Sequence, residues 1–193
     1  MELKSIETGI AGNHINSYTL TYENREGGTK KYEMVSRRND IKTLKDLQSQ
    51  QVDAVVVLAM NRTKDKILLE KEFRLPVGDY IYNFPAGMIE ENECAFEAAK
   101  RELFEETGLV MTKCIAMMPP AYGLAAITNE LTQFIICIAD GEIGGNPDVN
   151  EEIEANWYSK DEVLKLLRNN KFATRTQLFC YLWANNMLDL SNI

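Results

Sequence analysis

Residues 87–109 read GMIEENECAFEAAKRELFEETGL, and this stretch decides the fold. In its second half, apolar residues recur at the three- and four-residue spacing of one helix face, at Ala95, Ala98, Ala99 and Leu103. Gly108 stands where many helices end in a left-handed residue. We therefore predict a helix over 93–107 that turns one apolar stripe toward a core.

Three glutamates lie close together on this predicted helix. The spacing of Glu102, Glu105 and Glu106 lets all three project along one side, opposite much of the apolar stripe. Repulsion between exposed like charges at this spacing costs only about 0.2–0.5 kcal/mol per pair. A solvated acidic face is therefore one interpretation, and a bound cation is the other. The spacing alone does not decide between them.

The composition is that of an ordinary globular protein with one substantial core. Of the 193 residues, 45% are hydrophobic and 26% are charged. No apolar run reaches the roughly 18 to 20 residues that a membrane-spanning helix needs, and the first residues lack the pattern of a secretory leader. We expect a cytoplasmic protein that does not bind membranes.

The charge and the rare residue types narrow the chemistry. A formal charge of −8 is unfavourable for binding a nucleic-acid backbone, so we expect no nucleic-acid partner. The only histidine is His14, which nearly excludes Ser-His-Asp, Cys-His and histidine-rich metal sites. The four cysteines contain no C-x-x-C pair and fit buried or incidental thiols. Acid-base or metal chemistry must then fall to carboxylates, which bind magnesium or manganese through oxygen.

Strand and helix patterns alternate along the rest of the chain. In chain order we predict a hairpin at 17–36, a connector with a helical turn at 37–51, a second hairpin from 52–60 and 66–74, an irregular segment at 75–91, strands at 132–139 and 154–159, and helices at 160–170 and 174–187. The strand at 52–60 is nearly all apolar and is expected to be buried on both faces. This mixture indicates an α+β fold or an α/β/α sandwich.

The opening stretch also matches a known motif at every specified position. It resembles the Nudix box, G-x5-E-x7-R-E-U-x-E-E-x-G-U, in which U is apolar. The matching residues are Gly87, Glu93, Arg101, Glu102, Leu103, Glu105, Glu106, Gly108 and Leu109. The resemblance implies an α+β fold, namely a Nudix-type α/β/α sandwich with a mixed sheet at 51–193, preceded by an N-terminal β-rich arm at 1–50.

The resemblance also implies roles for residues of the box. The metal ligands would be Glu102, Glu105, Glu106 and the carbonyl of Ala86, with Mg²⁺ as the cofactor and Mn²⁺ as an alternative. Gly87 would let the backbone approach the substrate diphosphate. Arg101 and Glu93 would hold the loop and helix in register, although an ordinary surface pair and a helix-dipole partner are their simpler readings. Glu105, Glu106 and Arg101 are therefore candidate catalytic residues.

Beyond the box, residues 52–185 resemble the ADP-ribose pyrophosphatase branch. The resemblance makes Arg74 a candidate contact to a substrate phosphate, and implies a homodimer in which the arm packs between subunits. Glu151, in an acidic loop, aligns best with the carboxylate that acts on the metals or the attacking water. Its alternatives are Glu152, solvated surface, or Asp148 by a small shift, since Val149 replaces a second acid.

Several positions depart from the pattern of this branch. Asn92 replaces a frequent glycine, a mild change because asparagine tolerates left-handed backbone angles. Asn83 replaces a common glutamate before Pro-Ala-Gly, and Ala121, Tyr122 and Gly123 replace a Ser-Pro-Gly. These changes leave the group attached to the diphosphate open. Tyr122, Tyr80 and Tyr82 are candidates to stack on a base, or are simply core residues.

The activity implied by the resemblance is magnesium-dependent hydrolysis of a nucleoside diphosphate sugar. ADP-ribose, giving AMP and ribose 5-phosphate, is the first candidate substrate. GDP-mannose or a dinucleotide is the alternative within the same chemistry. A Nudix-like sensor that binds ADP-ribose without cleaving it is the alternative from another class, and the complete box argues against it.

Overall fold

The computed structural model describes residues 1–48, 50–144 and 150–188. The chain forms two compact units: residues 1–53 with 120–132, and residues 54–119 with 133–193. The first unit contains β1 (Glu2–Ala11), β2 (Asn16–Glu23), β3 (Thr29–Ser36), α1 (Leu44–Leu47) and β9 (Ala121–Tyr122). The second contains β4 (Ala54–Met60), β5 (Lys66–Arg74), β6 (Asp79–Asn83), β7 (Ala86–Met88), α2 (Ala95–Thr107), β8 (Val110–Met117), β11 (Ile153–Ser159), α3 (Lys160–Asn169) and α4 (Thr174–Ala184). The first two residues of β10 (Leu131–Asp140) belong to the first unit and the rest to the second.

In the first unit, β1, β2 and β3 form an antiparallel sheet in that order. Tyr18, Leu20, Met34 and Ile41 form its buried cluster. The predicted hairpin at 17–36 is confirmed, and its turn is closed by the Asn24 side chain, which accepts from the backbone N–H groups of Glu26 and Gly28. Our sequence analysis missed β1, because most of its residues are exposed and it lacks a clear apolar alternation.

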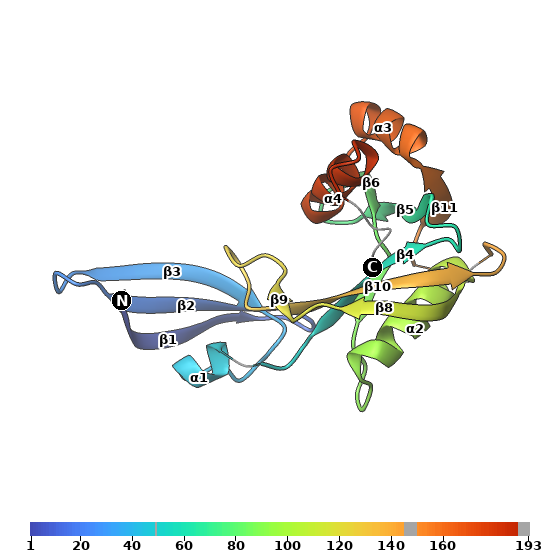
Figure 1. Ribbon diagram of the computed structural model, residues 1–193. Helices are drawn as coiled ribbons and strands as arrows, with labels where there is room; N and C mark the ends of the chain where they lie inside the picture. The colour runs from blue at the N-terminus through green and yellow to red at the C-terminus, as the bar shows by residue number, and fades with distance from the viewer. Residues whose placement is uncertain (49, 145–149, 189–193) are drawn as a thin grey trace. The chain divides into compact units, whose positions relative to one another are not determined.

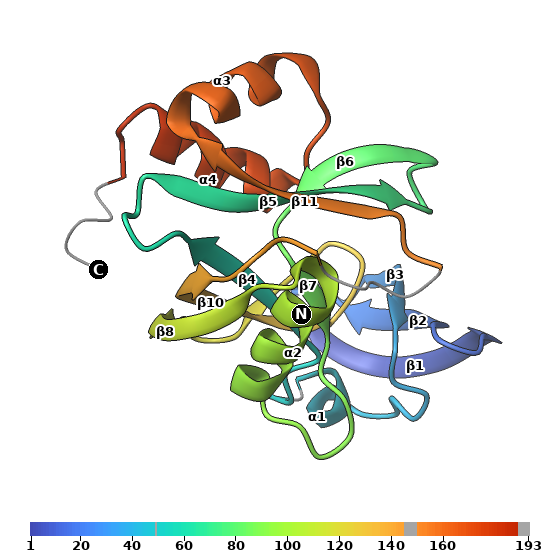
Figure 2. The same cartoon turned by 90° about the vertical axis from the view of Figure 1, so that its right-hand side faces the viewer.

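In the second unit, a mixed sheet lies between helices on its two faces (Figures 1 and 2). Its strand order is β11-β5-β4-β10-β8, with β6 beside β5 and β7 beside β4. Strand β4 is buried on both faces, as predicted. Val55, Val57 and Ala59 pack with α2, whereas Val56, Leu58 and Met60 pack with α3 and α4. This two-sided burial confirms the predicted α/β/α sandwich.

The segment at 75–91 is more regular than predicted. It forms β6, which pairs with β5, and β7, which pairs with β4. Strand β8 was also missed. The short strands β6 and β7 are held by backbone pairing with the longer β5 and β4, and the Pro and Gly residues around them obscure the strand pattern in the sequence.

The helix of the opening stretch, α2, runs from Ala95 to Thr107. Gly108 ends it with φ 76°, and its N–H donates to the carbonyl of Phe104, as the predicted left-handed cap requires. Asn92 adopts φ 66°, the backbone region expected for the residue that replaces glycine. The box therefore has the loop-then-helix geometry that its sequence predicts.

Two of the cysteines and one of the tyrosines considered for base stacking are buried in the core. Cys137 and Cys180 are buried free thiols, and burial raises the pKa of each to about 12. Tyr82 is buried and stacks on Phe172 at 5.3 Å between ring centroids. Tyr82 is therefore a core residue and is not available to stack on a base. Tyr80 and Tyr122 are partly exposed.

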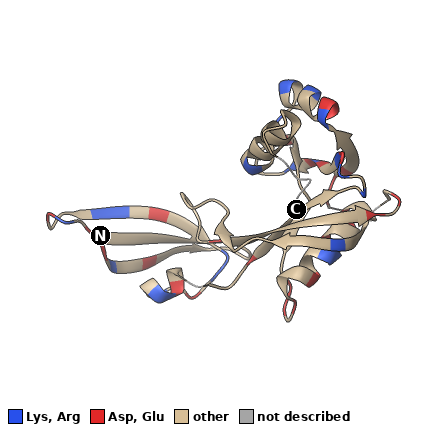
Figure 3. Cartoon of the chain, in the orientation of Figure 1, with Lys and Arg blue, Asp and Glu red and all other residues tan. Residues whose placement is uncertain are grey.

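Charged residues of both signs occur on strands of the first unit and on helices of the second (Figure 3). Lys4, for example, lies 3.0 Å from Glu2 and 3.1 Å from Glu23. No helix in the described part of the chain combines the length and apolar character that crossing a membrane requires.

Candidate active site

Gly87, in β7, lies directly against the carboxyl group of Glu102. A Cβ atom at position 87 would stand 1.9 Å from Glu102 Oε1 and 2.0 Å from its Cδ. Real atoms never approach this closely, so any side chain at position 87 would displace the carboxylate. The glycine of the box is therefore a steric requirement for the place of Glu102.

Arg101 binds three carboxylates with one guanidinium group. Its Nε and Nη2 donate to the two oxygens of Glu93 at 3.0 and 2.9 Å. Its Nη1 donates to Glu102 at 2.9 Å and to Glu105 at 3.0 Å. Nη2 also donates to the carbonyl of Met88 at 2.9 Å. The predicted orienting role of Arg101 thus has a structural basis, because one fork joins helix α2 to the loop before it.

The hydrogen bonds between Arg101 and Glu93 favour the charged form of each side chain. The hydrogen bonds from Arg101 lower the pKa of Glu93, and those to Glu93, Glu102 and Glu105 raise the pKa of Arg101. Glu93 also accepts from the N–H of Glu90 at 3.0 Å, which closes the loop. The Glu93 carboxylate is therefore ionised and bound at both oxygens.

Glu106 differs from its two neighbours in the box. It is buried, and its Oε2 accepts from the N–H of Ala86 at 3.1 Å. The expectation that all three glutamates lie opposite the apolar stripe was wrong for Glu106, since it follows the buried Leu103 by three residues and shares its side of α2. Glu105 remains on the outer side, with 52% of its side chain exposed.

Glu106 lies beside a carboxyl group that the sequence analysis did not single out. Glu70, in β5, is 1% exposed and lies within hydrogen-bonding reach of Glu106. Burial, followed by the nearby charge of Glu72, raises the pKa of Glu70, and burial, followed by Glu70, raises that of Glu106. Glu70 Oε1 is buried with no hydrogen-bond partner. A glutamate that directly follows Ile-Leu-Leu within a strand was the available signal, since buried carboxyl groups are rare without a purpose.

A hollow in the second unit brings several predicted residues together. Its lining residues are Glu72, Phe73, Arg74, Leu75, Pro76, Ala86, Glu106, Asn150, Glu151, Glu152 and Ile153. Four predicted site residues therefore line the same hollow although they come from different parts of the sequence: Arg74, Ala86, Glu106 and Glu151. Glu102 and Glu105 are not among the lining residues, and their carboxylates contact Arg101.

The segment that carries Glu151 is tied to the sheet by its neighbour. The N–H of Phe73 donates to the carbonyl of Glu152 at 3.0 Å. The hydroxyl group of Tyr80 donates to the Glu152 carboxylate, and this bond raises the pKa of Tyr80. Glu152 therefore holds this segment against β5 and β6 through its carbonyl and its carboxylate. Asp148 and Val149 lie outside the described residues.

The residues at this site fit a hard divalent cation. They offer only oxygen donors, which magnesium and manganese prefer. Gly87 keeps the space beside Glu102 free of a side chain, and the buried oxygen of Glu70 has no partner. Across residues 1–48, 50–144 and 150–188, no three acidic, histidine or cysteine side chains converge in a geometry ready for a metal ion. Cation binding would therefore need carboxylate side chains to rotate.

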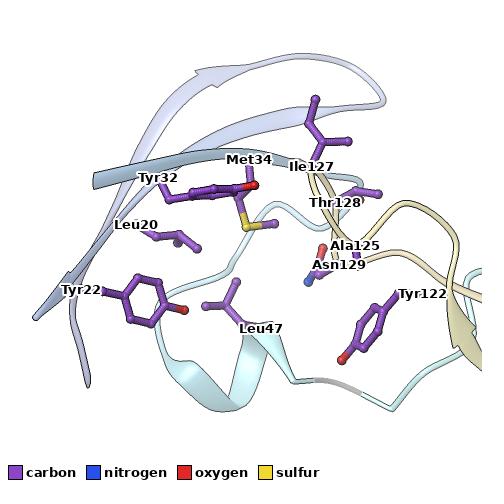
Figure 4. Close-up of a pocket in the computed structure, with 10 residues that line it drawn as sticks. All are labelled: Leu20, Tyr22, Tyr32, Met34, Leu47, Tyr122, Ala125, Ile127, Thr128 and Asn129. Atoms are coloured by element: carbon purple, nitrogen blue, oxygen red, sulfur yellow. The ribbon is translucent and has the colours of Figure 1, made fainter. Parts of the chain in front are cut away.

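The first unit contains a second hollow of different character (Figure 4). It is lined by Leu20, Tyr22, Tyr32, Met34, Leu47, Tyr122, Ala125, Ile127, Thr128 and Asn129. Its lining has three tyrosines and no charged side chain, so it offers aromatic surface but no carboxylate for a cation. Tyr122, a predicted base-stacking candidate, lies in this hollow.

Comparisons with known proteins agree with the motif. The NUDIX domain model matches residues 50–178. The chain is 32% identical to an ADP-sugar pyrophosphatase of Mus musculus over 154 residues, which cover 76% of this chain and 68% of that protein. It is 33% identical to an ADP-ribose pyrophosphatase of Saccharomyces cerevisiae over 111 residues, covering 55% of this chain and 48% of that protein, so it spans about half of the yeast sequence.

A solved structure gives the same result for the fold. The crystal structure of an ADP compounds hydrolase superposes with a TM-score of 0.73 at 18% identity, and the match covers 97% of this chain and 96% of that one. The family model covers more than half of the sequence, including the whole box. This chain therefore belongs to the NUDIX domain family.

Proposed function

We propose that this protein hydrolyses the diphosphate bond of a nucleoside diphosphate sugar, with ADP-ribose as the preferred substrate and AMP and ribose 5-phosphate as products. The observation that carries the proposal is the hollow where Arg74, Ala86, Glu106 and Glu151 meet. It combines a cationic side chain with carboxylates, as binding and cleaving a diphosphate require. The names of the mouse and yeast relatives favour an ADP-linked sugar.

The roles of the residues follow from their places. Glu106, Glu102 and the Ala86 carbonyl would hold the cation, and Glu105 would join them after release from Arg101. A bound Mg²⁺ or Mn²⁺ would neutralise phosphate charge and lower the pKa of the attacking water. Arg74 would contact a phosphate. Its present contact with Glu72 is 3.4 Å long and on an exposed side chain, so exchanging it for a phosphate costs little.

Glu151 is the proposed base that takes a proton from water. It lines the hollow, whereas the carboxylate of the adjacent Glu152 accepts from Tyr80. The two residues form a matched pair for a test. Glu151→Gln should lower kcat by roughly 10²-fold or more, the usual contribution of a general base. Glu152→Gln, which keeps an acceptor for Tyr80, should lower it far less. Equal losses in the two variants would remove Glu151 from this role.

The substrate is tested by a panel rather than by one compound. ADP-ribose, GDP-mannose and a dinucleoside diphosphate are incubated with and without Mg²⁺, and the phosphate monoesters are separated by ion-exchange chromatography. We expect cation-dependent AMP from ADP-ribose at the highest kcat/KM. Faster cleavage of another compound would reassign the substrate. Tight ADP-ribose binding by calorimetry without any cation-dependent product would identify a sensor instead.

We also propose that the protein is a cytoplasmic homodimer that uses the sheet of its first unit. Strand β1 stands at one edge of that sheet, and most of its residues are exposed, including Ile10. An exposed edge strand offers unpaired backbone groups to a second copy. Light scattering after size-exclusion chromatography measures the mass directly. The 22.0 kDa of a single chain would contradict the dimer.

A further inference from the structure

Glu72, in β5, is a carboxylate of the hollow that has no role in the proposed chemistry. It lines the hollow together with Glu106, Glu151 and Glu152. Glu106 is assigned to the cation and Glu151 to the water, and the carboxylate of Glu152 accepts from Tyr80. The Glu72 side chain is 13% exposed, so only a small part of it faces the hollow. A negative charge where a diphosphate binds is unfavourable, so this carboxylate needs another explanation.

A chain of hydrogen bonds from two buried side chains fixes the Glu72 carboxylate. The hydroxyl group of Thr176, in α4, donates to Asn83 Oδ1 at 2.8 Å, and Asn83 Nδ2 donates to Glu72 Oε1 at 3.2 Å. Thr176 is 0% exposed and Asn83 is 5% exposed. Because a carboxylate only accepts hydrogen bonds, the amide turns its nitrogen to Glu72 and its oxygen to Thr176. The asparagine that departs from the pattern of the branch therefore holds a carboxylate at the hollow.

The second oxygen of Glu72 lies beside the proposed phosphate contact. Oε2 is 3.4 Å from Arg74 Nη1. The hydrogen bonds from Asn83 and Arg74 use two of the roughly four acceptor positions of a carboxylate. When Arg74 turns to a phosphate, Asn83 still holds the other oxygen of Glu72. Glu72 then presents a fixed acceptor next to whatever group is bonded to that phosphate.

We propose that Glu72 is a specificity-determining residue that accepts a hydrogen bond from a ribose hydroxyl next to the diphosphate. Each phosphate of a nucleoside diphosphate sugar is bonded to a sugar, whose hydroxyls are neutral donors. A phosphate oxygen repels the carboxylate, whereas a hydroxyl satisfies it, so Glu72 favours substrates that place a hydroxyl there. Asn83 is the positioning residue for Glu72. This inference rests on the proposed function, because it places the diphosphate at Arg74.

The experiment removes the hydroxyl and the carboxylate separately and together, because only partners in contact give non-additive effects. The compounds are ADP-ribose, an analogue that lacks the hydroxyls of the adenosine ribose, and an analogue in which a tetrahydrofurfuryl group replaces the terminal ribose. We measure kcat/KM for each. The wild type should cleave one analogue about 10 to 100 times less efficiently than ADP-ribose, the usual value of a hydrogen bond to a charged group. The analogue that is affected identifies the ribose.

In Glu72→Met the preference for ADP-ribose over that analogue should fall to within about twofold, because the hydroxyl has lost its acceptor. Glu72→Gln keeps an oxygen that accepts and should retain part of the preference. Effects on Arg74 or on folding lower kcat/KM for all three compounds alike and cancel in the ratio. Lys71→Met is the matched control, since Lys71 is the adjacent residue of β5 and contacts the Tyr80 ring. It should keep the wild-type preference.

Asn83→Leu tests the positioning role without changing the lining of the hollow. It removes the donor to Glu72 and should weaken the preference in the presence of Glu72, but not further in a double variant with Glu72→Met. An unchanged preference in Asn83→Leu would remove Asn83 from this role.

The inference fails if Glu72→Met keeps the wild-type preference, or if the wild type cleaves all three compounds equally well. Glu72→Leu serves in place of Glu72→Met if that variant does not fold. A wild-type protein that cleaves none of the compounds would instead overturn the proposed function, on which the inference rests.

Discussion

The acidic residues around α2 form two groups that differ in how their charge is balanced. Glu93, Glu102 and Glu105 all contact one guanidinium group, that of Arg101. Glu106 accepts from the N–H of Ala86, and Glu70 is its buried acidic neighbour. The first group contacts a cation of the chain itself, although burial still raises the pKa of Glu102, whereas the second group is buried without a cation beside it.

Within one motif, some carboxylates are thus balanced by Arg101 until a cation is bound, and others have no cation of the chain beside them. An internal cation stabilises the fold, and carboxylates bound to it contribute to stability. Buried carboxyl groups without such a partner destabilise the fold, and proteins retain them where an external cation or substrate provides the balance. The comparison therefore predicts opposite consequences for stability and activity in the two groups.

The strongest test changes Glu106 and Glu105 separately to glutamine. Glu106→Gln should reduce kcat/KM for ADP-ribose by about 10³-fold, because a ligand of the cation contributes several kcal/mol to the transition state. Glu105→Gln should lose only about 10-fold, since Glu105 is exposed and bound to Arg101. Initial rates at saturating Mg²⁺ give both values.

The same two variants test stability. Glu106→Gln should not lower the free energy of unfolding, because it removes a charge from a buried acidic pair. Urea titrations measure this. A strongly destabilised Glu106→Gln variant, or equal kinetic losses at the two positions, would contradict the division into two groups.

Removing Arg101 should, unlike Glu106→Gln, cause a large loss of stability. Arg101→Ala leaves three carboxylates without their shared cation. Breaking a buried ion pair costs about 3–5 kcal/mol, and because the Arg101 side chain is 23% exposed we expect about 2–3 kcal/mol. Arg101→Lys keeps the charge but not the fork, so it should lose less. Urea unfolding that matched the wild type in both variants would show that the fork is not structural.

Gly87→Ala should affect both groups to a smaller extent. The added Cβ would stand 1.9 Å from Glu102 Oε1, so the carboxylate must leave its place or the loop must shift. We expect a loss of about 1–3 kcal/mol of stability, as for other overpacked sites, and weaker cation binding. Gly144→Ala is a useful control, since Gly144 has no atom within 4 Å of its added Cβ and no positive φ. A Gly87→Ala variant with unchanged Mn²⁺ affinity would show that Glu102 does not need this position.

The sequence named Glu106 as well as the residues around Arg101, but it did not point to Glu70. Arg101, Glu93 and Gly87 act within one loop and helix, so their spacing in the chain carries their geometry. Glu70 acts across strands, and nothing in its local sequence tells which residue of α2 it meets. The same reason explains the fold: β4 and α2 were predicted from local periodicity, whereas β6 and β7 depend on pairing with distant strands.

The smallest expected effect concerns pH and Glu93. Arg101 lowers the pKa of Glu93 in the folded protein below its ordinary value of 4.5. The ionised form is thus favoured by folding, so its contribution to stability is fully present above about pH 4.5 and is lost as the pH falls through the lowered value. The difference in unfolding free energy between wild type and Glu93→Gln should stay constant at neutral pH and shrink only in acid. Glu91→Gln, at an exposed position in the same loop, should show no such dependence. A difference that instead vanished between neutral pH and about pH 6 could not come from Glu93, because the pKa of Glu93 lies below its ordinary value of 4.5.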